Sequence, residues 1–258
     1  MEANQTGVLE IETSRGRNMT EYKNIIFVHI PKTAGKSVRK SLEKEIDESS
    51  IFPEHDQGSI LKAMKNGTHD HFVGHVGASF ALKYKPNDHF VFTFLRNPVN
   101  RLMSLYNFFS GLDLEKTGSD FTMKFAQENS VEDFFFSRDP RVLSYLDNTQ
   151  TWQLAIGADY MTRKKFSHIS EQELLKLARS NIMEMNFCGI TEYATKSVEL
   201  LGQLLKLPLV ENHINSSHAT TKFEDLSSGV KEKLRQYTAL DNILYNEQKE
   251  NFERQFLS

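Results

Sequence analysis

The stretch that decides the fold is residues 25–37, with the sequence IIFVHIPKTAGKS. Its first four residues form a short apolar run of β-favouring side chains, which predicts a buried strand. A loop with small residues follows, and Val38, Leu42 and Ile46 then fall at helical spacing. A strand, such a loop and a helix form a unit that places backbone N–H groups around an anion. The stretch therefore predicts an α/β fold with an anion-binding loop.

A second unit of the same kind covers residues 90–109. Residues 90–95 form another apolar run, which Arg96 and Asn97 interrupt before Pro98. Proline is favoured in the first turn of a helix, and the apolar residues that follow lie on one helical face. Residues 187–190 predict a third strand, and residues 194–207 predict a helix that Pro208 ends. Strands that alternate with helices predict a central, mostly parallel sheet flanked by helices on both faces.

Other segments predict helices or core packing but carry no candidate functional residues. Ser170 and Glu173 have the spacing of a capping box that opens a helix through Arg179. Residues from Ser227 onward predict two amphipathic helices, and the phenylalanines at 134–136 predict core packing.

Length and composition indicate a single globular domain. The chain has 258 residues, of which 39% are hydrophobic and 25% are charged. Residues 1–22 are polar and aperiodic and predict a loose tail, so the domain is assigned to residues 23–258. The formal charge of −3 argues against a broad basic face for nucleic acid, although it does not exclude a local anion site.

The compartment expected from the sequence is the cytoplasm. Cys188 is the single cysteine and cannot form an internal disulfide, which favours a reducing environment. The first residues, MEANQTGVLE, lack the apolar core of a signal peptide. No stretch approaches the roughly 20 apolar residues that a membrane-spanning helix needs.

The residues Gly35, Lys36 and Ser37 suggest a nucleoside triphosphatase, but the pattern is incomplete. A Walker A loop requires a glycine where this chain has Ile30. No apolar strand ends in an aspartate suited to magnesium. A kinase or nucleoside triphosphatase therefore stays as the alternative, beside an ordinary strand-to-helix turn.

The two loops resemble the signatures of the sulfotransferase family, and in particular the branch of heparan sulfate 2-O-sulfotransferase. HIPKTAGKS at residues 29–37 is similar to the 5′-phosphosulfate loop, and FTFLRNPVNRLMSLYNFF at 92–109 is similar to the second signature. Weaker similarities occur at residues 148–154, 189–193 and 241–245. The resemblance implies the sulfotransferase fold and a donor, PAPS (3′-phosphoadenosine 5′-phosphosulfate), that leaves as 3′,5′-ADP.

The resemblance implies two groups of donor-binding residues. Arg96 and Ser104 occupy the positions that contact the 3′-phosphate. The 5′ end is assigned to the first loop, where amides at a helix N-terminus, hydroxyl groups and cations suit an anion. Its residues are Lys32, Thr33, Ala34, Gly35, Lys36 and Ser37. Lys32 is also a catalytic candidate, because its ammonium can neutralise the leaving phosphate. No metal is expected. Lys36 and Arg101 have ordinary surface charges as alternative interpretations.

His75 is the candidate general base. Related enzymes carry a His-Gly-His-Val segment between the two loops, and residues 74–76 match its second half, whereas Val73 stands in place of its first histidine. A neutral imidazole can accept the acceptor's proton, so turnover is expected to fall in acid near an ordinary pKa of about 6.5. The alternatives are a buried structural histidine, or a zinc site with His69, Asp70 and His71.

The sequence therefore predicts an enzyme of the EC 2.8.2 class that transfers a sulfuryl group from PAPS to a hydroxyl, or less favourably to an amine. The acceptor is a small molecule or a carbohydrate. Acceptor specificity is assigned to loops such as residues 51–72 and 110–150, which show no readable motif. The charge of −3 and the expected lack of a membrane anchor favour a small or lipid-like alcohol over a long anionic polysaccharide. A catalytically silent nucleotide-binding module is the second alternative.

Overall fold

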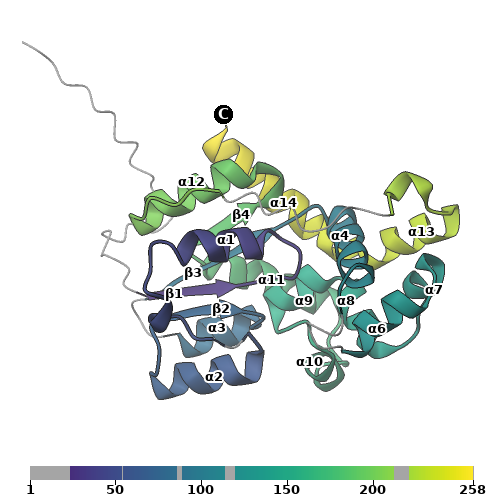
Figure 1. The fold of residues 1–258 in the computed structure, drawn as a ribbon, viewed down its shortest axis with the longest axis horizontal. Helices are drawn as coiled ribbons and strands as arrows, with labels where there is room; N and C mark the ends of the chain where they lie inside the picture. The colour runs from purple at the N-terminus through teal and green to yellow at the C-terminus, as the bar shows by residue number, and fades with distance from the viewer. Residues whose placement is uncertain (1–23, 54, 86–88, 114–119, 212–220, 258) are drawn as a thin grey trace, which may run out of the picture.

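Four parallel strands form the central sheet of the protein, for which we describe a computed structural model (Figure 1). The structure describes residues 24–53, 55–85, 89–113, 120–211 and 221–257. The strands are β1 (Asn24–Val28), β2 (His71–Gly74), β3 (His89–Leu95) and β4 (Phe187–Ile190). They lie in the order β2-β1-β3-β4, and all the pairings are parallel. The predicted α/β class is confirmed.

The strands end together at one edge of the sheet. Val28 lies beside Gly74 on one side and Thr93 on the other, and Leu95 lies beside Ile190. From β1 the chain passes to β2 and then crosses to β3, so the carboxyl ends of β1 and β3 flank the point where the strand order reverses. Ligands of open parallel sheets bind in the crevice at such a point. The loops that leave β1 and β3 are therefore placed for binding.

Helices surround the sheet and extend to one side of it. Their bounds are α1 (Gly35–Leu42), α2 (Gln57–Asn66), α3 (Ala78–Tyr84), α4 (Pro98–Ser110), α6 (Phe121–Glu128), α7 (Val131–Phe135), α8 (Pro140–Leu146), α9 (Thr149–Ala155), α10 (Tyr160–Lys165), α11 (Glu171–Glu184), α12 (Ala194–Leu205), α13 (Ser228–Tyr237) and α14 (Ala239–Phe256). Short 3-10 helices are η1 (Glu48–Ser50), η2 (Thr191–Tyr193) and η3 (Phe223–Asp225).

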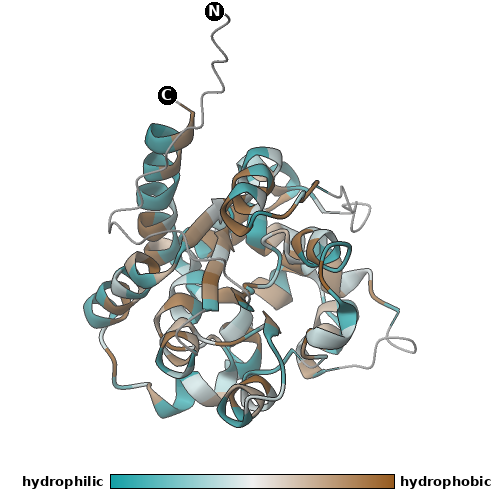
Figure 2. Cartoon of the chain, turned by 90° about the vertical axis from the view of Figure 1, so that its left-hand side faces the viewer, coloured by the Kyte–Doolittle hydropathy of each residue, from teal (hydrophilic) through white to brown (hydrophobic). Residues whose placement is uncertain are grey.

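Helices on both faces bury the strands. Figure 1 shows α1 in front of the sheet and α11 behind it. All seven residues of β3 are buried, which is why the strand is continuously apolar apart from His89 and Thr93. Figure 2 shows hydrophobic residues gathered toward the interior and hydrophilic residues on the outer sides of the helices.

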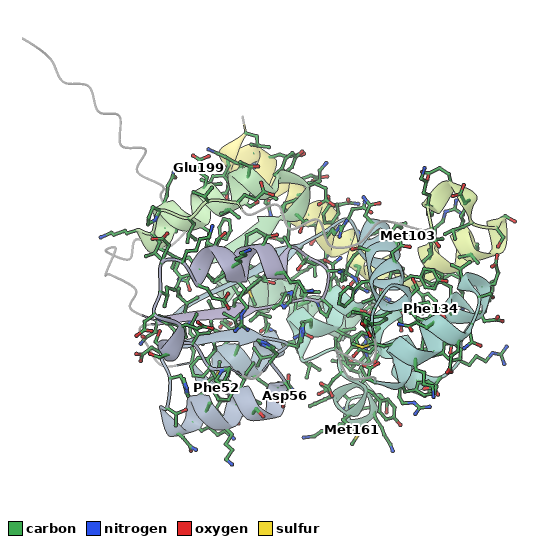
Figure 3. The ribbon with its side chains drawn as sticks, in the orientation of Figure 1. Phe52, Asp56, Met103, Phe134, Met161 and Glu199 are labelled. Atoms are coloured by element: carbon green, nitrogen blue, oxygen red, sulfur yellow. The ribbon has the colours of Figure 1, made fainter. Side chains whose placement is uncertain are left out.

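A second hydrophobic cluster lies beside the sheet, among α4, α6, α7, α8 and α13. Met103 and Phe134 belong to it and are labelled in Figure 3. The side chains of Phe134 and Phe135 are fully buried, which confirms their predicted core role. The same prediction is wrong for Phe136, which is 50% exposed at the end of α7. Tyr106 packs against the same two rings, which agrees with a packing role for it.

Most of the predicted elements are confirmed. The three predicted strands are β1, β3 and β4, and the two predicted C-terminal helices are α13 and α14. Ser170 forms the predicted capping box, and its helix continues past Arg179 to Glu184. β2 was not predicted, because it has only four residues and includes a histidine and a glycine. The predicted tail, residues 1–22, lies outside the described residues.

Within the described residues, no helix is both long enough and apolar enough to cross a membrane.

Candidate active site

The loop between β1 and α1 turns through two residues in the left-handed region. Lys32 has a φ of 73° and Ala34 a φ of 66°, both uncommon for residues with a side chain. Ala34 is the N-cap of α1 and makes no side-chain hydrogen bond there, and the first bond within the helix runs from the Val38 N–H to the Ala34 carbonyl at 3.0 Å. The N–H groups between these two residues therefore belong to an uncapped helix N-terminus, which attracts anions.

Two buried contacts hold this loop in place. The Thr33 side chain is fully buried, and its hydroxyl donates to the Ile30 carbonyl at 2.9 Å. Gly35 packs against the ring of His29, where an added Cβ would lie 1.7 Å from Nε2. Only glycine allows this approach. The hydroxyl proton of Thr33 therefore serves the loop itself, and the loop rests directly on His29.

The loop after β3 meets the first loop through Arg96. The Nη1 atom of Arg96 donates to the Lys32 carbonyl at 3.1 Å. The side chain of Gln150 bonds the backbone of Arg96 twice: Oε1 accepts from its N–H at 3.0 Å, and Nε2 donates to its carbonyl at 2.9 Å. The structure thus brings Lys32 and Arg96 together, as the two signatures require if they bind one ligand.

Arg101 is buried, so its interpretation as an ordinary surface charge is wrong. Its side chain is fully buried, with Nη1 donating to the Pro31 carbonyl at 3.4 Å and Nη2 donating to the Tyr145 carbonyl at 2.6 Å. Nε has no hydrogen-bond partner among the described residues. Burial lowers the pKa of Arg101 to about 10, which leaves the guanidinium charged at neutral pH. Arg101 therefore supports the first loop through its bond to the Pro31 carbonyl.

One face of α4 lies against the same loop. Ser104 is one turn after Arg101 and one turn before Phe108, so the three positions share a face. The Phe108 ring centroid is 3.9 Å from Nζ of Lys32 and 4.9 Å from Nζ of Lys36. Lys36 is exposed but lies over this ring. Ser104 is half-buried on the face of α4 that the lysines approach.

The positive charges of the two loops are close enough to repel one another. Burial, followed by the charges of Lys36 and Arg96, lowers the pKa of Lys32 to about 8. Burial also lowers the pKa of Arg96, and the charge of Glu192 opposes this shift. In the described part of the chain, no carboxylate forms an ion pair with Lys32 or Lys36. Such a cluster fits a bound anion.

His75 follows β2 and lies at the same edge of the sheet. Its Nδ1 lies 3.0 Å from the backbone carbonyl of His29. A carbonyl can only accept, so Nδ1 carries the proton and Nε2 of the neutral ring is free to accept one. The rings of His29 and His75 stack, with centroids 4.8 Å apart.

Both of these imidazoles are held neutral. Desolvation lowers the pKa of His75; its hydrogen bond to the His29 carbonyl opposes this, and the charge of His55 adds to it. The His75 side chain is exposed to the cavity that it lines, but protein atoms surround this cavity and desolvate the ring. Burial lowers the pKa of His29 well below its usual value. A neutral His75 suits a general base.

The other histidines near β2 do not join His75 in a metal site. His71 is buried at the amino end of β2, where its Nδ1 accepts from the Ile25 N–H at 3.2 Å. His69 lies against Thr68 and Phe52. Among the residues that the structure describes, no group of three His, Cys, Asp or Glu side chains could hold a metal ion together. The geometry does not support the zinc interpretation.

A cavity of about 390 Å³ opens beside Lys32 and His75. Its remaining walls come from α4, α6, α8, α9 and α10, with the intervening residues. Tyr160 of α10 lines the cavity, whereas the neighbouring Met161 is 67% exposed and is labelled at the outside in Figure 3. The two catalytic candidates therefore share one cavity.

The model of the sulfotransferase family matches residues 16–256 of the sequence, nearly its whole length. The chain belongs to the sulfotransferase family. No curated protein matches the sequence. Membership supports sulfuryl transfer and agrees with the parallel sheet and its flanking helices. The finer resemblance to the branch of heparan sulfate 2-O-sulfotransferase stays a prediction.

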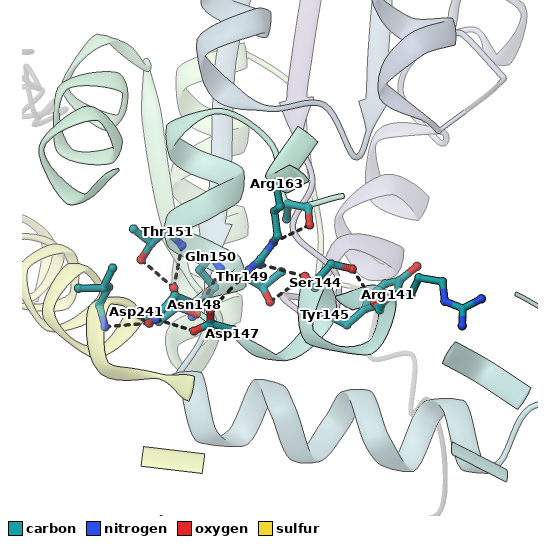
Figure 4. Close-up of polar contacts among 12 residues, drawn as sticks. Arg141, Ser144, Tyr145, Asp147, Asn148, Thr149, Gln150, Thr151, Arg163 and Asp241 are labelled. Carbon is teal, nitrogen blue, oxygen red and sulfur yellow. Dashed lines mark hydrogen bonds and ion pairs between the residues drawn. The ribbon is translucent and has the colours of Figure 1, made fainter. Parts of the chain in front are cut away.

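In this sulfotransferase, two of the segments with weaker sequence similarity, residues 148–154 and 241–245, contact each other and help to position Arg96. The carboxylate of Asp241 is buried at the start of α14 and accepts from the N–H and hydroxyl of Thr151, each at 2.7 Å, and from the Gln150 N–H at 3.2 Å (Figure 4). The Asn148 side chain accepts from the N–H groups of Leu240 and Asp241. α14 thus fixes the first turn of α9, from which Gln150 reaches Arg96.

Glu192 makes a parallel connection on the other side of the same loop. Its Oε1 accepts from the Asn97 N–H at 2.8 Å, and its Oε2 accepts from the Tyr245 hydroxyl at 3.0 Å. The similarities at residues 189–193 and 241–245 therefore mark residues that position the loop after β3.

Sequence reasoning missed the roles of three residues in the sulfotransferase site. His29 and Phe108 contact the predicted lysines or their loop, and Gln150 brackets Arg96. The sequence signal for Gln150 was the similarity at residues 148–154. For Phe108, the signal was its helical spacing from Ser104. His29 has no signal apart from its place just before the loop.

Proposed function

We propose that the protein transfers a sulfuryl group from PAPS to the hydroxyl of an acceptor and releases 3′,5′-ADP. One observation carries the proposal. The two loops beside the strand-order reversal bring Lys32 and Arg96 together, and His75 presents a free Nε2 in the adjoining cavity. The cations that would bind the sulfuryl donor and the base that would accept a proton thus lie at the same edge of the sheet.

The residues at the first loop fit the 5′-phosphosulfate of PAPS. The uncapped N–H groups of Gly35, Lys36 and Ser37 and the ammonium of Lys32 would bind it. Arg96, with its rigid guanidinium, and Ser104 on α4 would bind the 3′-phosphate. The mutual repulsion of the cations supports this assignment, because a bound polyanion would relieve it.

Two residues would carry the chemistry. As the acceptor oxygen forms its bond to sulfur, His75 takes the hydroxyl proton on Nε2. The bond between sulfur and the bridging phosphate oxygen breaks, and Lys32 neutralises the charge that develops there. The products are the sulfate ester and 3′,5′-ADP. We expect no metal in this scheme, since the chain's own cations neutralise the phosphates.

We further propose that residues 23–258 form the single sulfotransferase domain and that it works in the cytoplasm. The lone Cys188 supports a reducing compartment. Burial raises the pKa of its thiol to about 12, which disfavours the reactive thiolate at neutral pH.

The test of PAPS as donor compares 3′,5′-ADP with 5′-AMP by calorimetry. Arg96→Ala should weaken 3′,5′-ADP by roughly 10–100-fold, the scale of a lost charge-assisted hydrogen bond, and 5′-AMP by much less. Arg138→Ala, an exposed arginine outside the site, is the matched control. Equal weakening of both ligands would remove Arg96 from the 3′-phosphate site.

The activity itself is measured as transfer of labelled sulfate from PAPS to a panel of alcohols in the presence of a chelator. Transfer supports the proposal. Binding of 3′,5′-ADP without transfer to any alcohol would make the protein a silent binding module. Magnesium-dependent turnover of ATP without PAPS binding would make it a kinase or nucleoside triphosphatase.

A further inference from the structure

We infer that the cavity beside His75 takes an uncharged aromatic or alicyclic alcohol of one or two rings, and that it rejects anionic saccharides. The inference rests on the proposed function, because it names the acceptor of that same site. Three features of the cavity carry it: its apolar walls, the hydrogen bonds that already engage several of its polar side chains, and the sign of its charges.

The walls of the cavity are mainly aromatic and aliphatic. α4 and α6 contribute Leu105, Phe108, Phe109, Phe121 and Met123. A volume of about 390 Å³ lies toward the small end of the range for small-molecule sites, roughly 300–1,000 Å³. The cavity therefore suits a compact ligand that buries apolar surface against rings.

Several polar side chains of the wall are already engaged with the protein. Gln153 donates to the Val76 carbonyl at 2.7 Å and accepts from the Ala158 N–H at 3.1 Å. Ser144 donates to the Arg141 carbonyl at 2.7 Å, and the Tyr145 hydroxyl donates to Asp120 at 3.0 Å. A saccharide that enters the cavity loses many hydrogen bonds to water and needs bonds to the protein in their place. Gln153, Ser144 and Tyr145 already use their donors within the protein and are not free to supply these bonds.

The one cation on the far wall is neutralised. Among the described lining residues, the cationic side chains are Lys32, which faces the donor, and Arg141. Arg141 forms two hydrogen bonds to Asp139, from Nε at 2.9 Å and from Nη2 at 2.6 Å. Its guanidinium lies 3.4 Å from the centroid of the Phe121 ring. An anionic acceptor would find no free positive charge there.

Two carboxylates give the far wall a negative character instead. Asp120 and Asp159 line the cavity, and both raise the pKa of Tyr145, after the larger effect of burial. Repulsion from these carboxylates acts against a sulfate or carboxylate on the acceptor, which is how a site rejects a competitor. The negative charge of the wall thus excludes polyanions more strongly than the apolar lining alone would.

The test compares acceptors that differ only in charge. With PAPS as donor, 2-naphthol should have a kcat/KM at least tenfold above that of 6-hydroxy-2-naphthalenesulfonate, and a heparan-type oligosaccharide should not be sulfated. A better rate with the sulfonate or the oligosaccharide would overturn the inference. Binding of 2-naphthol to the complex with 3′,5′-ADP is measured separately by calorimetry.

The binding measurements separate the two proposals. If the protein does not bind 3′,5′-ADP, the proposed function fails. If it binds 3′,5′-ADP but neither binds nor sulfates 2-naphthol, the acceptor inference fails while the donor site stands.

Two pairs of variants test the wall directly. Phe121→Gln should raise the KM for 2-naphthol about tenfold without changing 3′,5′-ADP affinity, because Phe121 is 39% exposed and its loss removes only wall contact. Phe136→Gln, on another helix end and 50% exposed, is the control. An unchanged KM in Phe121→Gln would overturn the assignment of this wall.

Asp120→Asn removes a charge while keeping a side chain that can cap α6. It should reduce the preference for 2-naphthol over its sulfonate at least threefold. Asp47→Asn, an exposed cap of η1 distant in sequence from the cavity, should leave that ratio unchanged. An equal ratio in both variants would show that charge does not set the selectivity.

Discussion

At the scale of single residues, the tautomer of His75 decides what it can do. Because Nδ1 donates to the His29 carbonyl, Nε2 is the atom that accepts a proton. His75→Ala should slow the chemical step by roughly 10²–10⁴-fold, the usual contribution of a positioned base. The affinity for 3′,5′-ADP should hardly change, because the residues proposed to bind the donor lie in the two loops. Single-turnover rates and calorimetry on the same variant measure both.

The pH profile gives a second reading of His75. Its pKa lies below the ordinary value, so the ring is neutral at pH 7 and becomes charged only in more acid solution. The acid limb of turnover should therefore fall below about pH 6.5 rather than at it. His75→Asn should be no faster than the alanine variant, since an amide cannot take the proton. An active alanine variant, or one that loses 3′,5′-ADP and melts early, would contradict the base role.

Lys32 should control the alkaline limb. Its pKa is lowered to about 8, so raising the pH through this value discharges the ammonium in the free enzyme. We expect kcat/KM for PAPS to fall above about pH 8 and Lys32→Arg to move this limb to higher pH. Lys32→Ala should lose about 2–4 kcal/mol of transition-state stabilisation. Lys40→Ala, exposed on α1, is the control, and a normal rate in Lys32→Ala would remove Lys32 from the mechanism.

At the scale of elements, the position of α1 depends on the contact between Gly35 and His29. A Cβ at residue 35 would meet the imidazole of His29 at 1.7 Å, so Gly35→Ala must move the loop or the ring. We expect this variant to lose at least tenfold in 3′,5′-ADP affinity, because the N–H groups at the start of α1 move with the loop. His29→Ala in the same chain should recover part of the loss by removing the obstructing ring.

Gly58 of α2 offers a matched control for this substitution. An added Cβ there would meet only the Asp56 side chain, at 3.3 Å, and alanine is the better helix former. Gly58→Ala should therefore leave 3′,5′-ADP affinity unchanged. If Gly35→Ala binds as well as Gly58→Ala, the contact with His29 does not set the loop.

How far the sequence predicts each element follows from how local its signal is. The strands β1 and β3 and the loops after them were predicted, because apolar runs that end in Gly, Pro or charged residues are local patterns. β2 was missed because four residues give too little periodicity. The burial of Arg101 was not predicted either, since its partners, the carbonyls of Pro31 and Tyr145, come from segments far apart in the chain.

The acceptor cavity shows the same limit. Its walls come from helices between residues 98 and 165, and each of those helices is ordinary when taken alone. Only their packing places Phe121 and Asp120 across from His75. The sequence therefore predicts the two loops from local patterns, whereas the wall of the cavity emerges from the tertiary structure.

At the scale of the whole molecule, Asp241 joins the C-terminal helix to the edge of the sheet. Its carboxylate satisfies two backbone N–H groups and one hydroxyl of α9 and lies near Arg101. Asp241→Ala leaves these donors without a partner, and the free energy of unfolding should fall by about 3–5 kcal/mol. For a chain of this size, the melting temperature should fall by roughly 6–20 °C.

The same substitution should reach the donor site, although Asp241 lies outside it. Loss of the α9 anchor frees Gln150, which brackets Arg96, so 3′,5′-ADP affinity should fall together with stability. Asp225→Ala, which removes an exposed carboxylate, should change stability by no more than about 0.5 kcal/mol. Calorimetric melting and 3′,5′-ADP titration of both variants measure the two effects. A stable Asp241→Ala protein with full affinity would show that the bonds from Asp241 to α9 do not support the loop after β3.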